Sequence, residues 1–262
     1  MADEQYNENI IQRHGKTTAM NLKRTRFLPN GLEPSQFIKP EGNFWGRVFN
    51  CLYQAWGDPF WWPASSAWEV AVGAVLTQNT AWRNVESAIC NLESQRLTTP
   101  ESILSADIEM LANTIRSSGY YNNKAKKLKE LAKWWSEIMV GNRYKSLTDE
   151  NLRERLIDVW GVGNETADSI LCYALGRPLF TVDAYTNRIR SRLLGEDGVI
   201  NYSELQNEVH SQLPRDTMLF NHFHGLLVTL GKNQCKSKNS LCRECPVLEI
   251  CKYGKNKIGK SE

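Results

Sequence analysis

The spacing of apolar residues constrains the fold of this chain more than any other feature of the sequence. From about residue 43 onward they recur every three or four positions, which places them along one face of successive α-helices. The segments predicted to be helical are 44–56, 67–78, 81–92, 107–118, 123–139, 148–160, 164–176, 183–195, 202–213 and 217–231. We find no convincing strand pair and no repeat of fixed period in the sequence. The predicted fold class is therefore all-α.

Composition and charge are ordinary for a globular protein. The chain has 262 residues, is 41% hydrophobic and carries a formal net charge of +3. No apolar run reaches the roughly 18 residues that would span a membrane. Two groups of basic residues stand out: Lys124, Lys126, Lys127, Lys129 and Lys133, and then Lys232, Lys236, Lys238 and Arg243. Each group can create a local positive face, although the first is equally typical of a solvated helix surface.

A glycine turn connects two of the predicted helices, in the stretch "ERLIDVWGVGNETADSILCYALG". Gly161 and Gly163 would let the helices approach closely and leave backbone N–H groups free where the second helix begins. The partial positive charge at that end suits a phosphate group. A Gly-x-Gly turn alone is more often just a tight helix connection. Twenty residues past Gly163, the apolar run "LFTVDAY" places Asp183 at the start of a further helix.

Taken together, "GVGNETADSILCYALG" and "TVDAY" resemble the helix-hairpin-helix DNA glycosylases of the endonuclease III superfamily, over roughly residues 44–253. The resemblance implies that Gly161, Gly163 and Asn164 bind DNA phosphates and that Asp183 is the catalytic carboxylate. It also implies two domains with a cleft between them, one a helical barrel and the other carrying an iron–sulfur cluster. The expected boundaries are a polar N-terminal arm over 1–40, a barrel domain over 64–176 with the hairpin at 152–176, and a discontinuous domain over 41–63 and 177–262.

Glu165 occupies the position at which the bifunctional members of that superfamily carry a lysine. The lysine forms a Schiff base with the sugar and cuts the strand, whereas a carboxylate cannot form an imine. The sequence therefore predicts a monofunctional glycosylase with weak or absent AP-lyase activity. We expect Glu165 to stabilise the first turn of its helix electrostatically.

Four of the seven cysteines, Cys235, Cys242, Cys245 and Cys251, are separated by six, two and five residues. The odd total and the clustering argue against a disulfide framework and for a single metal or cluster site. By chemistry alone, four thiolates suit either zinc or an iron–sulfur cluster. The spacing matches the [4Fe–4S] loop of endonuclease III-like enzymes, so the resemblance implies a mainly structural [4Fe–4S] cluster. Its loop would present Lys236, Lys238 and Arg243 to DNA phosphates.

The stretch "FWWPASSAWEVAVGAVLTQNTAW" resembles the 3-methyladenine DNA glycosylase III branch of the superfamily. The resemblance implies that Gln78 enters the base stack when the damaged nucleotide is extruded. It also implies a base pocket lined by Trp61, Trp62, Pro63 and Trp82. Indoles attract a cationic methylated purine, although tryptophans are also common in cores.

One position departs from the branch. Leu226 stands where a member of the branch that lacks the cysteine box can carry a lysine. This difference leaves the preferred base open. His222 and His224 lie nearby, and we expect both to be hydrogen-bonded helix residues; the sequence leaves their role in the pocket open.

The predicted function is hydrolysis of the N-glycosidic bond of 3-methyladenine or 7-methylguanine flipped from duplex DNA. Two alternatives remain open: a uracil or thymine mismatch glycosylase on the same fold, and a non-enzymatic DNA-binding module with a four-cysteine zinc site. The expected partner is double-stranded DNA containing a damaged base, bound by a monomer without any membrane association. The expected location is the cytoplasm, at the nucleoid through DNA.

Overall fold

The computed structural model describes residues 42–259, and every regular element within that range is a helix. The all-α prediction is thereby confirmed. The N-terminal arm expected over 1–40 lies outside the described residues. None of the described helices is both long and apolar enough to cross a membrane.

All ten helices expected from the apolar spacing are present, several with shifted ends. The α-helices are α2 (Phe44–Trp56), α3 (Ala67–Leu76), α4 (Trp82–Ser94), α5 (Pro100–Ser105), α6 (Ile108–Thr114), α7 (Tyr121–Met139), α8 (Asp149–Ile157), α9 (Asn164–Tyr173), α10 (Ala184–Leu194), α11 (Tyr202–Gln212), α12 (Thr217–Asn233) and α13 (Lys252–Gly259). The short helices α5 and α13 were not predicted. The segment 107–118 divides into α6 and a 3₁₀ turn over Arg116–Ser118.

Polar side chains fix several helix starts, as expected of N-caps. Thr148 accepts a hydrogen bond from the Asn151 N–H at 3.2 Å before α8. Asp183 accepts one from the Thr186 N–H at 2.7 Å before α10. The two caps fix the helix starts on either side of the glycine turn, whereas α9, which begins at that turn, has no side-chain cap.

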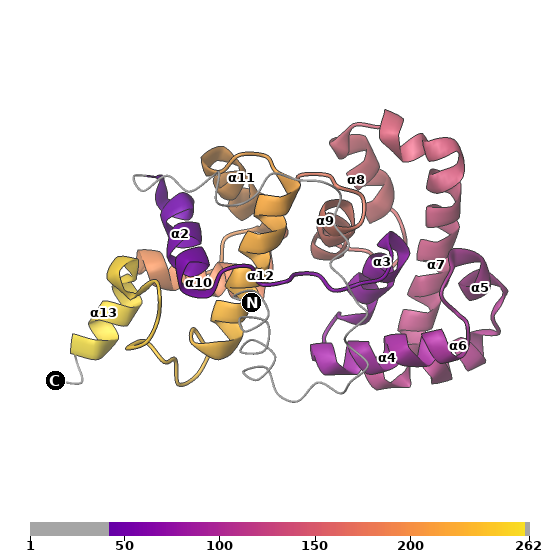
Figure 1. The fold of residues 1–262 in the computed structure, drawn as a ribbon, viewed down its shortest axis with the longest axis horizontal. Helices are drawn as coiled ribbons and strands as arrows, with labels where there is room; N and C mark the ends of the chain where they lie inside the picture. The colour runs from indigo at the N-terminus through magenta and orange to yellow at the C-terminus, as the bar shows by residue number, and fades with distance from the viewer. Residues whose placement is uncertain (1–41, 260–262) are drawn as a thin grey trace, which may run out of the picture.

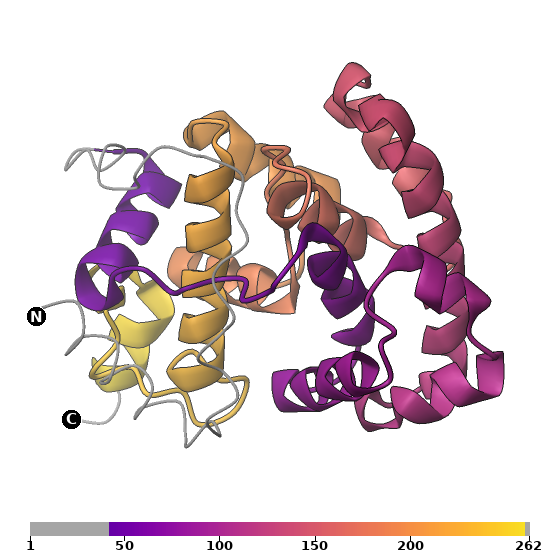
Figure 2. The same cartoon turned by 45° about the vertical axis from the view of Figure 1, so that its right-hand side comes forward.

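The helices form two groups that lie side by side (Figures 1 and 2). One group contains α2 and α10 to α13, and α2 contacts α11 and α12 although they are far apart in sequence. The other contains α3 to α9, with α3 packed between α4, α7 and α9. Contacts between α9 and α12 join the groups. Domain boundaries at 63/64 and 176/177 remain a prediction.

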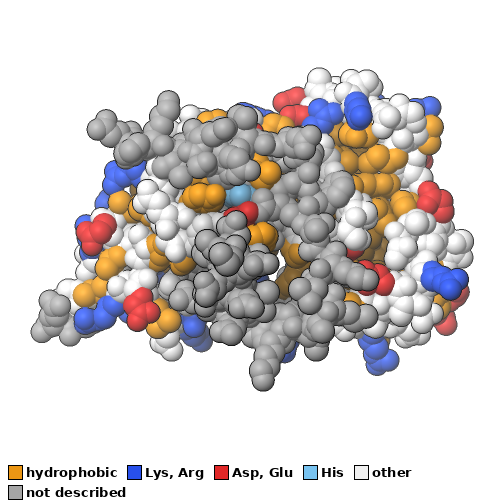
Figure 3. Space-filling model, in the orientation of Figure 1, with side chains coloured by type: hydrophobic (Ala, Val, Ile, Leu, Met, Phe, Trp, Pro, Cys, Tyr) orange, Lys and Arg blue, Asp and Glu red, His pale blue; other side chains and the backbone are white. Residues whose placement is uncertain are grey.

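Several lysines of the first basic group bond to the protein itself, which leaves fewer of them to form a positive face. Lys124 is 2% exposed and donates to the carbonyls of Leu76 at 2.9 Å and Ser118 at 2.7 Å. Burial, and then the charge of Lys127, lowers the pKa of Lys124 to about 8. Lys129 bonds the carbonyls of Leu104 and Ala106. On the face seen in Figure 3, basic and acidic side chains are interspersed along the edges.

Candidate active site in a helical cleft

A cleft of about 760 Å³ opens where the loop after α3, the start of α9 and the start of α10 meet. Its lining includes five residues predicted to act at the site or to stand at a family position: Gln78, Gly163, Asn164, Glu165 and Asp183. Lys127 of α7 and Tyr202 of α11 also line it, although sequence reasoning assigned no role to either in a site. This volume lies within the range typical of ligand pockets.

The two glycines of the turn differ in the reason why a side chain would be unfavourable at each position. Gly161 has φ +87°, and a Cβ there would stand 2.4 Å from Cγ of Lys127. Gly163 has φ −103° and no atom within 4 Å of a built Cβ. A side chain at 161 would therefore clash inside the protein, whereas one at 163 would enter open space in front of the α9 N-terminus. That open space is where the N–H groups of α9 can meet an external anion.

Asp183 reaches the cleft from the N-cap of α10, and its side chain is 10% exposed. Oδ1 accepts hydrogen bonds from the Thr186 N–H at 2.7 Å and the Thr186 hydroxyl at 2.8 Å. Oδ2 faces Nε2 of His224 at 3.5 Å. Burial alone would raise the pKa of Asp183, but His224 and the Thr186 donors outweigh it and hold the pKa below its ordinary value. Asp183 is thus an ionised carboxylate that faces the cleft.

Glu165 lies in the first turn of α9, in the same cleft as Asp183. Glu165 is exposed to solvent, although its side chain lies within the cleft and other residues of the cleft surround it. This partial burial raises the pKa of Glu165, the charge of Asp183 raises it further, and His224 lowers it to a smaller extent. The cleft therefore holds two carboxyl groups with opposite pKa shifts. Such pairs are characteristic of acid–base sites.

Gln78 lies just beyond α3 and is held against the glycine turn. Its Nε2 donates to the Gly161 carbonyl at 3.1 Å and to the Thr166 hydroxyl at 3.0 Å. Its Oε1 accepts from Nζ of Lys127 at 2.6 Å. Lys127 thus joins α7 to the loop and the turn at once. An amphipathic pattern alone could not have separated it from its lysine neighbours.

The predicted pocket tryptophans gather in one aromatic group, but none of them is among the residues that line the cleft. The Trp62 ring lies 5.2 Å from Trp61 and 4.7 Å from Trp82, both edge to face. Trp62 is 4% exposed and packs on Gly73 of α3, while Trp61, Pro63 and Trp82 are half-buried. Trp62 therefore belongs to the core, and a role in base binding remains a prediction for all four residues.

A buried carboxylate next to the site, Asp168 of α9, was missed from the sequence. Its side chain is fully buried and pairs with the Arg153 guanidinium through two bonds of 2.6 and 3.1 Å. Tyr202 and Gln206 each donate to Oδ2 at 2.7 Å. Tyr202 also accepts from the Val182 N–H, and Gln206 donates to the Phe180 carbonyl. Asp168 thereby anchors the segment that ends at Asp183.

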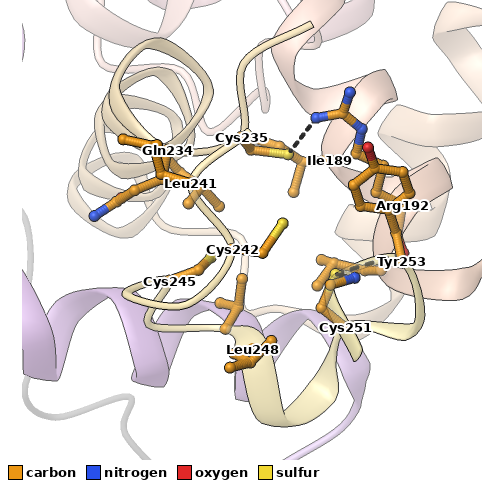
Figure 4. Close-up of a pocket in the computed structure, with 14 residues that line it drawn as sticks. Ile189, Arg192, Gln234, Cys235, Leu241, Cys242, Cys245, Leu248, Cys251 and Tyr253 are labelled. Carbon is orange, nitrogen blue, oxygen red and sulfur yellow. Dashed lines mark hydrogen bonds between the residues drawn. The ribbon is translucent and has the colours of Figure 1, made fainter. Parts of the chain in front are cut away.

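The four clustered cysteines lie apart from this cleft, where they line a common cavity at α10 and the segment between α12 and α13 (Figure 4). Nη1 of Arg192 donates to Sγ of Cys235 at 3.3 Å, and the Gly254 N–H donates to Sγ of Cys251 at 3.3 Å. Burial raises the pKa of Cys245 to about 11, and the neighbouring thiols add to the effect. Within residues 42–259, no three His, Cys, Asp or Glu side chains form a ready-made metal-ion centre. The four thiols line one cavity.

The predicted DNA-contacting residues of this loop, Lys236, Lys238 and Arg243, are all exposed. Asn164 differs from them, because its Oδ1 already accepts a hydrogen bond from Nη2 of Arg153 at 3.0 Å. The amide group of Asn164 is thereby oriented beside the open space in front of Gly163.

Comparison with known proteins gives consistent matches. Residues 72–215 match the family model of the HhH-GPD superfamily base excision DNA repair proteins. A candidate DNA repair glycosylase of Methanocaldococcus jannaschii is 43% identical over 212 residues, which cover 78% of this chain and 94% of that protein. The thymine-DNA glycosylase of Aeropyrum pernix is 28% identical over 210 residues, covering 78% and 91%. Endonuclease III enzymes of several organisms are also relatives.

Among solved structures, the 3-methyladenine DNA glycosylase of H. pylori bound to 1,N6-ethenoadenine superposes with a TM-score of 0.59. It is 28% identical to this chain, and the match covers 70% of this chain and 95% of that one.

Proposed function

Because the chain belongs to the HhH-GPD superfamily of base excision DNA repair proteins, we propose that it is a monofunctional DNA glycosylase for alkylated purines. It would act as a monomer on double-stranded DNA and hydrolyse the N-glycosidic bond of 3-methyladenine or 7-methylguanine. The observation that carries this proposal is the placement of Asp183. It is an ionised carboxylate in a cleft that is also lined by the open start of α9.

The reaction needs stabilisation of positive charge on the sugar as the base departs. Asp183 would face the anomeric carbon, stabilise the oxocarbenium-like transition state and orient the attacking water. The free N–H groups at Gly163 and the oriented amide of Asn164 would bind the phosphate backbone beside the flipped nucleotide. Gln78 would fill the space that the nucleotide leaves, once it exchanges its bonds in the protein for contacts with DNA.

The identity of Glu165 supports monofunctional chemistry. A strand-cleaving glycosylase forms an imine between an amine and the sugar, and the side chain at this point of the cleft is a carboxyl group. Hydrolysis by water, and not a covalent Schiff base, is therefore the proposed route.

The alkylated-purine preference rests on the aromatic group and on the 3-methyladenine glycosylase of H. pylori among the similar structures. A purine methylated at N3 or N7 is cationic, and the half-exposed indoles of Trp61 and Trp82 would attract it. The charge also weakens the glycosidic bond, so that little protonation of the leaving base is needed. Trp62 would support the two outer rings from the core.

A thymine or uracil mismatch glycosylase is the second candidate, because a thymine-DNA glycosylase covers 78% of this chain. A neutral pyrimidine is a poorer leaving group and gains more from a proton donor. Glu165, whose pKa is raised by burial and by Asp183, is the group in the cleft that could supply one.

We further propose that Cys235, Cys242, Cys245 and Cys251 hold a [4Fe–4S] cluster. The donor set fits such a cluster, since four thiols line one cavity and two of them already accept hydrogen bonds from Arg192 and Gly254. A bound cluster would cross-link the loop and supply no step of a hydrolysis. The loop would then present Lys236, Lys238 and Arg243 to phosphates.

The deciding experiment is a single-turnover panel of duplexes that contain 3-methyladenine, 7-methylguanine, uracil opposite guanine or thymine opposite guanine. Release of the methylated purines alone supports the proposal, whereas release of only the pyrimidines establishes the mismatch function. Failure to release any base, by protein that binds these duplexes, would remove the enzymatic assignment. Borohydride trapping on the same DNA tests the absence of a Schiff base, and a yellow-brown colour with matching iron and sulfide content tests the cluster.

A further inference from the structure

His224 lies inside the apolar helix α12, yet it has polar partners on two sides. Its residue is 4% exposed, and its ring is stacked on Tyr173 with centroids 6.0 Å apart. Nδ1 lies 2.7 Å from the Tyr173 hydroxyl, and Nε2 lies 3.5 Å from Oδ2 of Asp183. The sequence suggested an ordinary hydrogen-bonded helix histidine. The structure instead places it between a buried phenol and the carboxylate of the cleft.

The surroundings determine which ring nitrogen carries the proton. Burial raises the pKa of Tyr173 well above its ordinary value, so the phenol keeps its proton and can donate it to Nδ1. A neutral imidazole that accepts at Nδ1 carries its hydrogen on Nε2. Among the described residues, Nε2 of His224 meets no other hydrogen-bond partner. Asp183 is therefore the acceptor that faces it.

The distance of 3.5 Å between Nε2 and Oδ2 is longer than an ordinary N–H···O bond of about 2.9 Å. Hydrogen bonds in active sites are often long without substrate and shorten in the complex. Oδ1 is already fixed by both donors of Thr186, so the carboxylate needs only a small rotation to close the gap.

We propose that His224, oriented by Tyr173, is a positioning residue for Asp183: its Nε2–H binds Oδ2, fixes the plane of the carboxylate and keeps it ionised. This inference rests on the proposed catalytic role of Asp183. A neutral donor suits the task, because a permanent positive charge beside Asp183 would compete with the cationic sugar that the carboxylate must stabilise.

Other charged and titratable groups also face Asp183. Asp183 raises the pKa of Glu165 of α9, so these two carboxyl groups repel each other, whereas Lys232 of α12 interacts favourably with Asp183. Tyr173 of α9 is uncharged, and Thr186 of α10 contributes two dipoles. His224 is the neighbour with the largest favourable influence on the carboxylate. Its removal should therefore be measurable against this background.

The test is a carboxyl-carbon NMR titration of Asp183 in the full-length purified protein, assigned with Asp183→Asn. His224→Phe keeps an aromatic ring and removes the donor, so the Asp183 midpoint should rise on the order of one pH unit. Tyr173→Phe removes the hydroxyl that keeps the proton off Nδ1 of His224, so the Asp183 midpoint should rise by a smaller amount. His224→Gln keeps an N–H donor and should restore most of the shift. His222→Phe is the matched control, since His222 is buried on the same helix but lies by Asp58, and it should leave the midpoint unchanged.

Nitrogen NMR of the unmodified protein should show His224 protonated at Nε2 and bare at Nδ1. The opposite tautomer, or a midpoint in His224→Phe equal to that of the unmodified protein, overturns the inference. If His224→Phe does not fold, the tautomer together with Tyr173→Phe and His224→Gln decides the question.

Activity separates this inference from the proposed function. The acid limb of the base-release rate should move upward in pH by the same amount as the NMR midpoint. If the midpoint moves and the rate profile does not, the coupling of His224 to Asp183 stands and the catalytic role of Asp183 is wrong.

Discussion

Asp168 and Asp183 are two inward-facing carboxylates on neighbouring segments, and they differ in how many of their lone pairs are used. Asp168 has no exposed surface and accepts four hydrogen bonds, from Arg153, Tyr202 and Gln206. Asp183 accepts two bonds at one oxygen and faces His224 and the cleft with the other. A saturated carboxylate can only hold structure together, whereas one with free lone pairs can act on a ligand.

Replacement of Asp168 should have the larger effect on stability. Asp168→Asn leaves the Arg153 guanidinium beside a neutral amide, and because the Arg153 side chain is 22% exposed the cost should lie near the lower end of the roughly 3–5 kcal/mol for breaking a buried pair. We expect a loss of that size in chemical unfolding, with base release per folded molecule nearly unchanged at low temperature. Near-normal stability of this variant would contradict the anchoring role.

Asp183→Asn should reverse this result. Asparagine is as good an N-cap as aspartate, so helix α10 should survive, but the charge that stabilises the transition state is lost. We expect base release to fall on the order of 10³-fold, with lesion binding largely retained, in single-turnover assays and gel shifts. An unchanged rate would remove Asp183 from the mechanism.

The two glycines sharpen the same contrast between structure and function. Gly161→Ala forces a side chain into a left-handed backbone and against Lys127, so we expect a loss of about 1–2 kcal/mol in stability. At Gly163 the φ is ordinary and a Cβ would enter open space, so Gly163→Ala should leave stability unchanged. The added methyl group would stand in front of the α9 N-terminus, so affinity for undamaged duplex DNA should fall. Equal effects of the two substitutions on stability would show that the turn is purely structural.

Glu165→Gln should produce the smallest change, and its pH dependence has a definite sign. The folded pKa of Glu165 lies above the unfolded value, so the ionised form destabilises the fold; this penalty appears as the pH rises past the unfolded pKa and is complete above the folded pKa. The glutamine variant should melt slightly higher near pH 7, and this gain should vanish as the pH falls below the unfolded pKa of about 4.3. A gain that persists at low pH would point to a different cause.

The contrast also explains what the sequence could and could not predict. Helix α2 matched the expected 44–56 because its apolar face repeats with helical period. Asp183 could be located because a short motif surrounds it. Asp168 could not, since its partners Arg153, Tyr202 and Gln206 come from 15 to 38 positions away.

The burial of individual side chains also could not be predicted from the local sequence pattern. Trp62 and its neighbours read alike in the sequence, yet the core covers Trp62 and leaves Trp61 and Trp82 half-exposed. In the sequence Lys124 is one lysine among several, although its amine donates a hydrogen bond to the carbonyl of Leu76 at the end of α3. In both cases the deciding contacts come from other helices, which periodicity along one segment does not specify.

The three hydrogen bonds of Gln78 have a consequence for the order of events on DNA. In the free protein this side chain is hydrogen-bonded to Gly161, Thr166 and Lys127. If Gln78 entered a base stack, Gly161, Thr166 and Lys127 would each lose a hydrogen bond unless the duplex supplied new partners at the same time. A phosphate beside Lys127 would compensate for the largest of these losses, so the side chain should leave its resting place only after the backbone has docked.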